Sequence, residues 1–142
     1  MRMLALDVGD RRIGVAMSDP IGILASPLTT IQRRSEDEDV QSVLDLVAEH
    51  DVGEIVIGLP LTLSGERGTQ ARRAGRFKNA LAARTAVTLN DQDERYSTVQ
   101  AERLMRESGV EPSRERGRVD AAAAAVILQA YLDAGRSSNS GS

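Results

Sequence analysis

Apolar positions in the first third of the chain follow the period of a β-strand. Residues 3–6 form a short apolar run, residues 13–18 alternate between apolar and small or polar side chains, and residues 23–31 form a third apolar stretch that Pro27 interrupts. An alternation of period two is typical of a half-buried strand. Because turn-forming residues separate the three stretches, the pattern predicts three short strands in an antiparallel meander.

The middle of the chain changes to helical spacing. Ser35 and Glu38 form a capping box, and the apolar residues after them recur at helical intervals, which predicts an amphipathic helix ending near His50. The compact apolar run at residues 54–58 is typical of a buried parallel strand. A loop follows it, and a second amphipathic helix is expected over residues 69–84.

The last third of the chain predicts one more strand and two more helices. Residues 87–89 form a short strand that runs into a polar stretch. A capping box opens a third helix over residues 97–109, and the charged segment 111–118 is expected to be a mobile loop. The last helix is expected from about residue 119 to residue 133.

The order of these elements predicts a single α/β domain in which helices flank a mixed sheet of five strands. The length of 142 residues fits one domain and allows an independent hydrophobic core. We expect this domain over residues 1–134 and a flexible, Ser- and Gly-rich end over residues 135–142. The apolar stretch at the start is too short for a signal peptide or a membrane span, which indicates a cytoplasmic protein without a membrane partner.

The composition limits the chemistry that the chain can perform. It has no cysteine and a single histidine, His50, which excludes a disulfide scaffold, a thiolate metal site, a cysteine nucleophile and any mechanism that needs two histidines. Carboxylates, hydroxyls and arginines remain. The net charge of −3, from 18 basic and 21 acidic residues, argues against bulk coating of nucleic acid but allows a local basic patch.

Three acidic residues lie where functional sites of α/β sheets form, beyond the carboxyl ends of the strands. Asp7 ends the first strand, Glu94 follows the last strand, and Asp120 begins the last helix. Taken singly, they fit a turn residue, a solvated loop charge and an acid favoured by a helix dipole. Brought together, three carboxylates repel one another unless a cation such as Mg²⁺ or Mn²⁺ neutralises them. Paired ions of this kind activate water for phosphodiester hydrolysis without histidine or cysteine.

Four segments of the sequence carry recognisable motifs: LDVGDRRIGVA at residues 6–16, VIGLPL at 56–61, DERYST at 93–98 and VDAAAA at 119–124. These segments resemble the YqgF family, whose members are also described as RuvX-type Holliday-junction resolvases or pre-16S rRNA nucleases. Together they cover nearly the whole chain in the right order. The resemblance implies an RNase H-like fold related to RuvC resolvases, and it implies that Asp7, Glu94 and Asp120 are the metal-binding catalytic acids.

The resemblance also implies a substrate, with two alternatives. Members of the family are bacterial, cytoplasmic and implicated in maturing the 5′ end of pre-16S rRNA, which suggests ribosomal assembly intermediates as partners. Resolution of four-way DNA junctions is the competing proposal for the family. A carboxylate–metal site contacts the phosphate and not the sugar, so these residues do not separate RNA from DNA. A resolvase is expected to be a homodimer, whereas a monomer suffices for RNA processing.

Residues near the acids are candidates for substrate binding, each with a plainer alternative. Gly9 lets a phosphate or a metal approach the backbone, or it simply allows a tight turn. Five arginines are candidates for phosphate contacts, and each also fits a solvated surface charge: Arg11, Arg12, Arg95, Arg116 and Arg118. The last two lie in a stretch that resembles the family's basic segment before the last acid, although glutamates dilute it here.

Two other functions compete with a nuclease. The first segment also resembles the first phosphate loop of actin-like sugar kinases and chaperone ATPases, but one domain of this length does not build their two-domain nucleotide cleft. A non-catalytic RNA-binding module is the second alternative. The presence of all three acids favours an enzyme over such a module.

Overall fold

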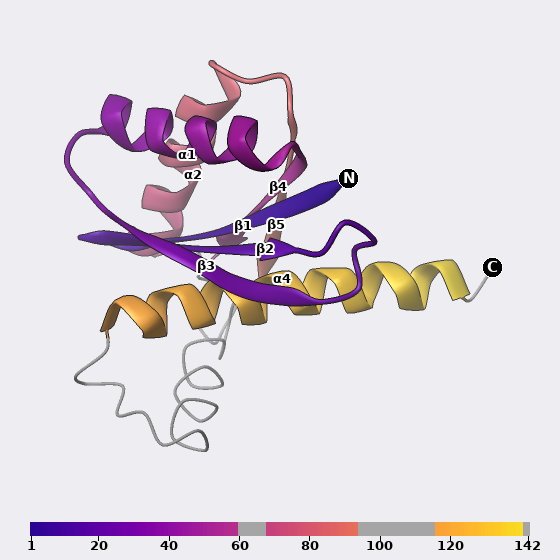
Figure 1. The fold of residues 1–142 in the computed structure, drawn as a ribbon. Helices are drawn as coiled ribbons and strands as arrows, with labels where there is room; N and C mark the ends of the chain where they lie inside the picture. The colour runs from indigo at the N-terminus through magenta and orange to yellow at the C-terminus, as the bar shows by residue number, and fades with distance from the viewer. Residues whose placement is uncertain (60–67, 94–115, 141–142) are drawn as a thin grey trace.

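The strands of the protein form one mixed sheet. The structure, a computed structural model, describes residues 1–59, 68–93 and 116–140 (Figure 1). Its elements are, in chain order, β1 (Arg2–Val8), β2 (Arg12–Ser18), β3 (Ala25–Gln32), α1 (Glu36–His50), β4 (Val52–Leu59), α2 (Thr69–Ala82), β5 (Thr88–Asp93) and α4 (Arg116–Ser140). The five strands are ordered β3-β2-β1-β4-β5. Neighbours among β1, β2 and β3 are antiparallel and β1, β4 and β5 are parallel, which confirms the predicted meander and mixed sheet.

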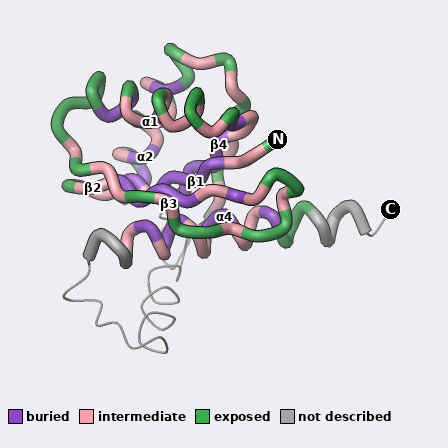
Figure 2. The backbone as a smooth tube through the Cα atoms, in the orientation of Figure 1, coloured by how far each residue is buried: buried purple, intermediate pink, exposed green. Residues whose placement is uncertain are grey.

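Helices cover both faces of the sheet, so that two hydrophobic clusters result. α1 and α2 lie on one face, here called the α1/α2 face, and α4 crosses the other, the α4 face, beneath the sheet in Figure 1. Successive residues of a strand serve opposite faces. In β1, Leu4 and Leu6 join the cluster under α1 and α2, whereas Ala5 between them joins the cluster under α4. Figure 2 shows β1 largely buried and much of α1 exposed on its outer side.

α1 begins where the capping box predicts. Ser35 is the N-cap, and its hydroxyl accepts a hydrogen bond from the backbone N–H of Glu38 at 3.2 Å. The helix ends at His50, and Asp51 follows in the left-handed conformation with a φ of 53°. This conformation is a common way to close a helix, and it turns the chain directly into β4.

β3 is an edge strand whose register shifts where proline interrupts it. Val15 of β2 pairs with Thr29, but the next residue, Ala16, pairs with Pro27, so that Leu28 is the extra residue of a bulge. Proline lacks the N–H that a central strand needs, and an edge strand with a bulge tolerates that loss.

The bounds of the last elements differ from those that the sequence predicts. β5 continues through Asp93 because β4 supplies backbone partners for the polar residues after the predicted stretch. α4 begins at Arg116, so the end of the expected loop is helical, and residues 135–140 continue the helix where a flexible end is expected. Each residue that extends a formed helix adds a backbone hydrogen bond, which favours this continuation. The predicted helix at residues 97–109 lies outside the described residues.

α4 packs closely on the sheet because small side chains meet there. Its buried residues Ala124, Ile127, Leu128 and Leu132 form one cluster with Ala5, Ala16 and Val56 of the sheet. Within the described ranges, no helix combines the length and the apolar character that crossing a membrane requires.

Candidate metal site at the carboxyl edge of the sheet

Asp7 lies near the carboxyl end of β1 and belongs to the α4 face. β1 extends to Val8, so Asp7 is inside the strand rather than at its last position. Its neighbours Leu6 and Val8 join the cluster under α1 and α2. Because side chains alternate along a strand, Asp7 is directed to the opposite face, where it is half-buried.

α4 brings Asp120 to the same part of the sheet. Asp7 pairs with Gly14 across the β1–β2 ladder. A Cβ atom added to Gly14 would lie 2.0 Å from the backbone oxygen of Asp120, so the start of α4 rests directly on this glycine. Only a residue without a side chain permits so close an approach. Two acids that are far apart in the sequence therefore lie on one face of the sheet, one beside Gly14 and the other above it.

The carboxylate of Asp120 is paired with an arginine of β2. Arg12 Nε donates a hydrogen bond to Asp120 Oδ2 at 2.7 Å, and the two side chains are 26 % and 27 % exposed. Arg12 lies two residues before Gly14 and shares its face of the sheet. The sequence predicts Arg12 as a phosphate contact, whereas in the structure it neutralises a predicted metal ligand. Asp120 is thus a half-buried acid whose charge Arg12 offsets.

The third predicted acid, Glu94, follows directly after β5 and, like Arg95, lies outside the described residues. Asp93 ends β5 and pairs with Leu59 at the carboxyl end of β4. Because β1, β4 and β5 are parallel, these ends share the edge of the sheet where Asp7 lies. Across residues 1–59, 68–93 and 116–140, no three acidic, histidine or cysteine side chains gather as a metal-binding group.

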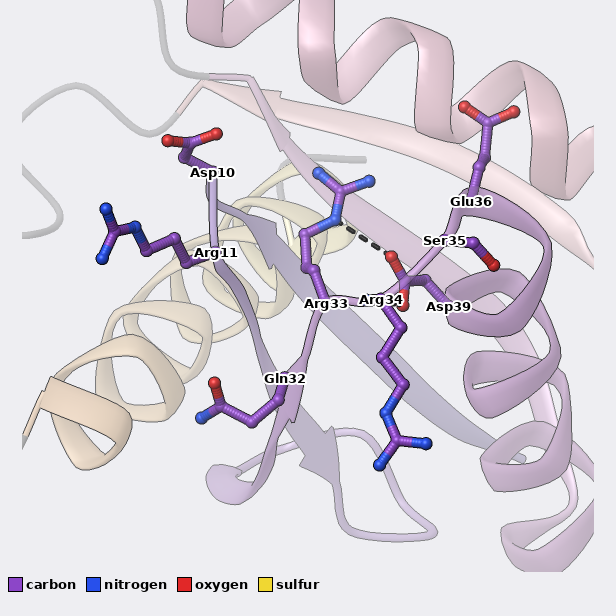
Figure 3. Close-up of a pocket in the computed structure, with 8 residues that line it drawn as sticks. All are labelled: Asp10, Arg11, Gln32, Arg33, Arg34, Ser35, Glu36 and Asp39. Atoms are coloured by element: carbon purple, nitrogen blue, oxygen red, sulfur yellow. Dashed lines mark hydrogen bonds and ion pairs between the residues drawn. The ribbon is translucent and has the colours of Figure 1, made fainter.

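Gly9 forms the tight turn that follows Asp7. Its N–H donates to the backbone oxygen of Arg12 at 2.8 Å, and an added Cβ would lie 2.7 Å from that oxygen. Arg33 Nη1 donates to the Gly9 carbonyl oxygen at 3.1 Å, and Arg33 Nε donates to Asp39 Oδ2 at 3.1 Å (Figure 3). The turn accounts for a glycine at this position, and its approach to a phosphate stays a prediction.

Sequence reasoning missed the part that Arg33 and Asp39 play in holding this turn. Asp39 is 2 % exposed, and its Oδ1 also accepts the backbone N–H of Arg34 at 3.0 Å. The Arg33 guanidinium carbon lies 5.5 Å from the centre of the Phe77 ring, a cation–π distance. Asp39 precedes the buried Val43 by one helical turn, and this spacing was the signal that could have placed it on the inner side of α1.

A cavity of about 470 Å³ opens beside the same turn (Figure 3). It is lined by Asp10, Arg11, Gln32, Arg33, Arg34, Ser35, Glu36 and Asp39. Arg11 is exposed, points away from Arg33 in Figure 3, and makes no ion pair with any residue that the structure describes. Acidic side chains offset the three arginines of the lining, so the cavity is not a strongly positive site.

A second polar cluster, which the sequence did not indicate, ties α4 to the sheet away from this edge. Tyr131 Oη donates to Glu54 Oε2 at 2.5 Å, and Asn90 Nδ2 donates to the same oxygen at 2.8 Å. The hydrogen bond to Glu54, together with partial burial, raises the pKa of Tyr131 to about 12. Glu54 lies in the first half of β4, so this cluster is structural and separate from the acids at the carboxyl edge.

Solved structures that match this fold include two resolvases. Thermus thermophilus RuvC in complex with a Holliday junction substrate matches with a TM-score of 0.60 and 17 % identity, over 96 % of this chain and 96 % of that chain. Fowlpox virus resolvase, in complex with Holliday junction DNA, matches with a TM-score of 0.59 and 10 % identity, over 94 % of this chain and 98 % of that chain. The protein therefore has the α/β fold of RuvC-like resolvases.

Sequence comparison assigns the chain to a family within this class. Residues 1–134 match the family described as "RuvX: Holliday junction resolvase". A Chloroflexus aurantiacus protein named "Putative pre-16S rRNA nuclease" is 44 % identical over 135 residues, which are 95 % of this chain and 88 % of the relative. A Chloroflexus aggregans protein of the same name is 46 % identical over 134 residues, 94 % of each chain. The chain belongs to the RuvX family, as its motifs predict.

Proposed function

We propose that this protein is a metal-dependent nuclease that hydrolyses phosphodiester bonds of nucleic acid beside Asp7 and Asp120. The observation that carries the proposal is that Gly14 lets α4 bring one acid over the strand next to the other. The nuclease names of the relatives and the resolvase description of the family support it. The substrate we propose is the 5′ end of pre-16S rRNA, processed by a domain over residues 1–134 on ribosomal assembly intermediates in the bacterial cytoplasm.

Three acids would hold Mg²⁺ or Mn²⁺: Asp7, Asp120 and Glu94, the residue directly after β5. The two acids that the structure describes fit such an ion, because they offer half-buried carboxylate oxygens on one face of the sheet. Carboxylates on one small surface repel each other, and a bound cation offsets that repulsion. When bound, the ion supplies charge neutralisation at the phosphodiester and activation of the attacking water.

The arginines and the glycine near this edge would bind and orient the phosphate backbone. Gly9 leaves the turn after Asp7 free of a side chain, and Arg11 projects from the same turn. Arg116 and Arg118 lie in the first turn of α4, just before Asp120. Phosphate contacts of this kind fix the register of a strand without reading its sequence. The proposed phosphate-binding arginines are Arg11, Arg12, Arg95, Arg116 and Arg118.

Replacing either acid by its amide tests the mechanism. We expect Asp7→Asn and Asp120→Asn each to lower the cleavage rate by about 10²-fold or more, because the amide keeps the shape and removes the ligand charge. The matched control is Asp45→Asn, which changes an exposed acid of α1 and is expected to keep the rate. Circular dichroism verifies that each variant is folded. Full cleavage by both site variants would contradict the mechanism.

A four-way DNA junction is the second candidate substrate, because the family that matches is described as a Holliday junction resolvase. Precursor 16S rRNA and a synthetic junction, assayed side by side with Mg²⁺ or Mn²⁺, decide between them. Symmetric cutting of two strands requires a homodimer, so the mass in solution is measured in the same buffer. RNA binding that is equal in wild type and Asp7→Asn, with no cleavage by either, would identify a non-catalytic binding module.

A further inference from the structure

The fold holds the backbone of both partners in the ion pair between Arg12 and Asp120. The backbone of Asp120 cannot move closer to β2, since it rests on Gly14. Arg12 is the first residue of β2, so its backbone is fixed by the ladder to β3, where it pairs with Gln32. The 2.7 Å between Nε and Oδ2 is typical of a charge-assisted hydrogen bond. The fold therefore places the guanidinium directly on the carboxylate that the proposed function assigns to the metal.

We propose that Arg12 is an internal cation that occupies Asp120 until a divalent metal ion displaces it. The inference rests on the proposed function, which makes Asp7 and Asp120 metal ligands. A metal ion at Asp120 uses the carboxylate that the guanidinium now neutralises, and the two cations repel each other at such short range. The ion pair must then open when the metal binds. The free energy needed to open it makes the free energy of metal binding less favourable and so weakens the affinity.

The geometry lets the guanidinium leave without a change in the backbone. The Arg12 side chain is 26 % exposed, so its head can move into solvent while its stem stays against the sheet. Its positive charge beside Asp120 offsets the repulsion between this carboxylate and that of Asp7. After displacement, a guanidinium lies free at the edge where a phosphate would bind. Arg12 would therefore contact a phosphate only after the metal has bound, so its predicted role as a phosphate contact does not compete with metal binding.

Metal affinity in the absence of nucleic acid tests the inference. Isothermal titration of Mn²⁺ into the full-length protein is compared for wild type, Arg12→Gln and Arg11→Gln at one salt concentration. We expect Arg12→Gln to bind Mn²⁺ about fivefold more tightly, as the loss of a partly exposed ion pair implies. Arg11→Gln removes the same charge one residue away, from a side chain without an ion pair in the described part of the chain, and we expect a change below about twofold because salt screens it.

Thermal unfolding gives a second readout that does not depend on cleavage. Arg12→Gln is expected to unfold at a lower temperature than wild type when EDTA keeps the protein free of metal, because Asp120 loses its counter-charge. At saturating Mn²⁺ the difference between the two proteins is expected to shrink, since wild type has then opened the ion pair that the variant lacks. Arg11→Gln is expected to show the same difference with and without the metal.

Two outcomes would overturn the inference and leave the proposed metal site standing. Equal effects of Arg12→Gln and Arg11→Gln on Mn²⁺ affinity would mean that only long-range charge acts. Weaker Mn²⁺ binding by Arg12→Gln would mean that Arg12 holds Asp120 in place for the metal. A third outcome, Mn²⁺ binding that survives unchanged in both Asp7→Asn and Asp120→Asn, would overturn the metal site itself and this inference with it.

Discussion

The two faces of the sheet are built from different kinds of side chain. On the α1/α2 face the strands contribute large apolar residues, among them Leu4, Leu6, Ile13, Val15, Ile55 and Ile57. On the α4 face the same strands contribute Ala5, Ala16 and Val56 to the apolar cluster. The polar groups Asp7, Arg12 and Glu54 belong to this second face as well. The central strands β1, β2 and β4 therefore direct their large apolar side chains to the first face and Asp7, Arg12 and Glu54 to the second.

This difference follows from the period of two in the strands. It places the residues that stabilise the fold on one face and the residues of the candidate site on the other. Every second residue of β1 is free to be acidic or small while its neighbours fill the core on the other side. Small residues let one long helix approach the sheet closely enough for its backbone to contact Gly14. The charged groups then meet where the helix starts. Substitutions on the first face should change mainly stability, and substitutions under the start of α4 should change mainly the site.

Truncation of Leu81 in α2 tests the first face and has the largest expected effect on stability. Leu81 is 0 % exposed and belongs to the larger cluster. Leu81→Ala is expected to lower the free energy of unfolding by about 2–5 kcal/mol, measured by urea titration. The cleavage rate per folded molecule at low temperature is expected to stay within about twofold of wild type, because the proposed acids are on the other face.

The conservative variant Leu81→Met is the control for this experiment. It keeps most of the buried volume and is expected to cost less than about 1.5 kcal/mol. If Leu81→Ala stayed folded but lost most of its cleavage rate, the two faces would be coupled and the separation argued above would be wrong.

Adding one methyl group at Gly14 tests the second face. Gly14→Ala puts a Cβ 2.0 Å from the backbone oxygen of Asp120, so α4 must move away from β2. We expect a loss of about 1–3 kcal/mol in the free energy of unfolding. Because a displacement of about 1 Å at a reacting group can cost 10²-fold, the cleavage rate is expected to fall by about that factor. Urea titration and the cleavage assay measure the two effects.

A glycine-to-alanine substitution in α2, which covers the first face, is the matched control, and it is expected to raise the free energy of unfolding rather than lower it. Gly75 lies in the interior of α2, and an added Cβ there meets nothing within 4 Å. Gly75→Ala is expected to stabilise the protein by about 0.5–1 kcal/mol, because glycine in a helix costs more conformational entropy than alanine. Similar effects of the two glycine substitutions would contradict the close contact between α4 and β2.

Much of the fold could be predicted because its patterns are local. The alternation in residues 13–18 predicts β2, and the capping box at Ser35 predicts the start of α1. The end of β5 was missed, because its polar residues gain their strand conformation from pairing with β4 and not from their own propensity. The start of α4 was missed for a related reason, since a charged segment extends a helix that packing elsewhere stabilises.

In the candidate site too, local sequence patterns predicted some features, whereas others depend on contacts between distant parts of the chain. Asp7 and Asp120 were predicted from their places at element ends, and the structure brings them to one face. The pairing of Arg12 with Asp120 could not be predicted, because it depends on how α4 is set against β2. The steric role of Gly14 depends on the same packing. Sequence patterns thus identify the chemical groups, and the packing of α4 determines which of them interact.

Removing the hydrogen bond from Tyr131 to Glu54 has the smallest expected effect on the free energy of unfolding, and this effect depends on pH. Tyr131→Phe removes a donor that is partly exposed, so the expected loss in the free energy of unfolding near neutral pH is below about 1 kcal/mol. The pKa of Tyr131 is raised from 10.0 to about 12 in the folded protein, so its stabilising contribution is fully present below pH 10. As pH rises from 10 toward 12, the unfolded chain loses this proton first and the contribution is lost. Urea titrations of wild type and Tyr131→Phe should therefore converge across that window, and two curves that stay parallel would mean that the phenol does not donate to Glu54.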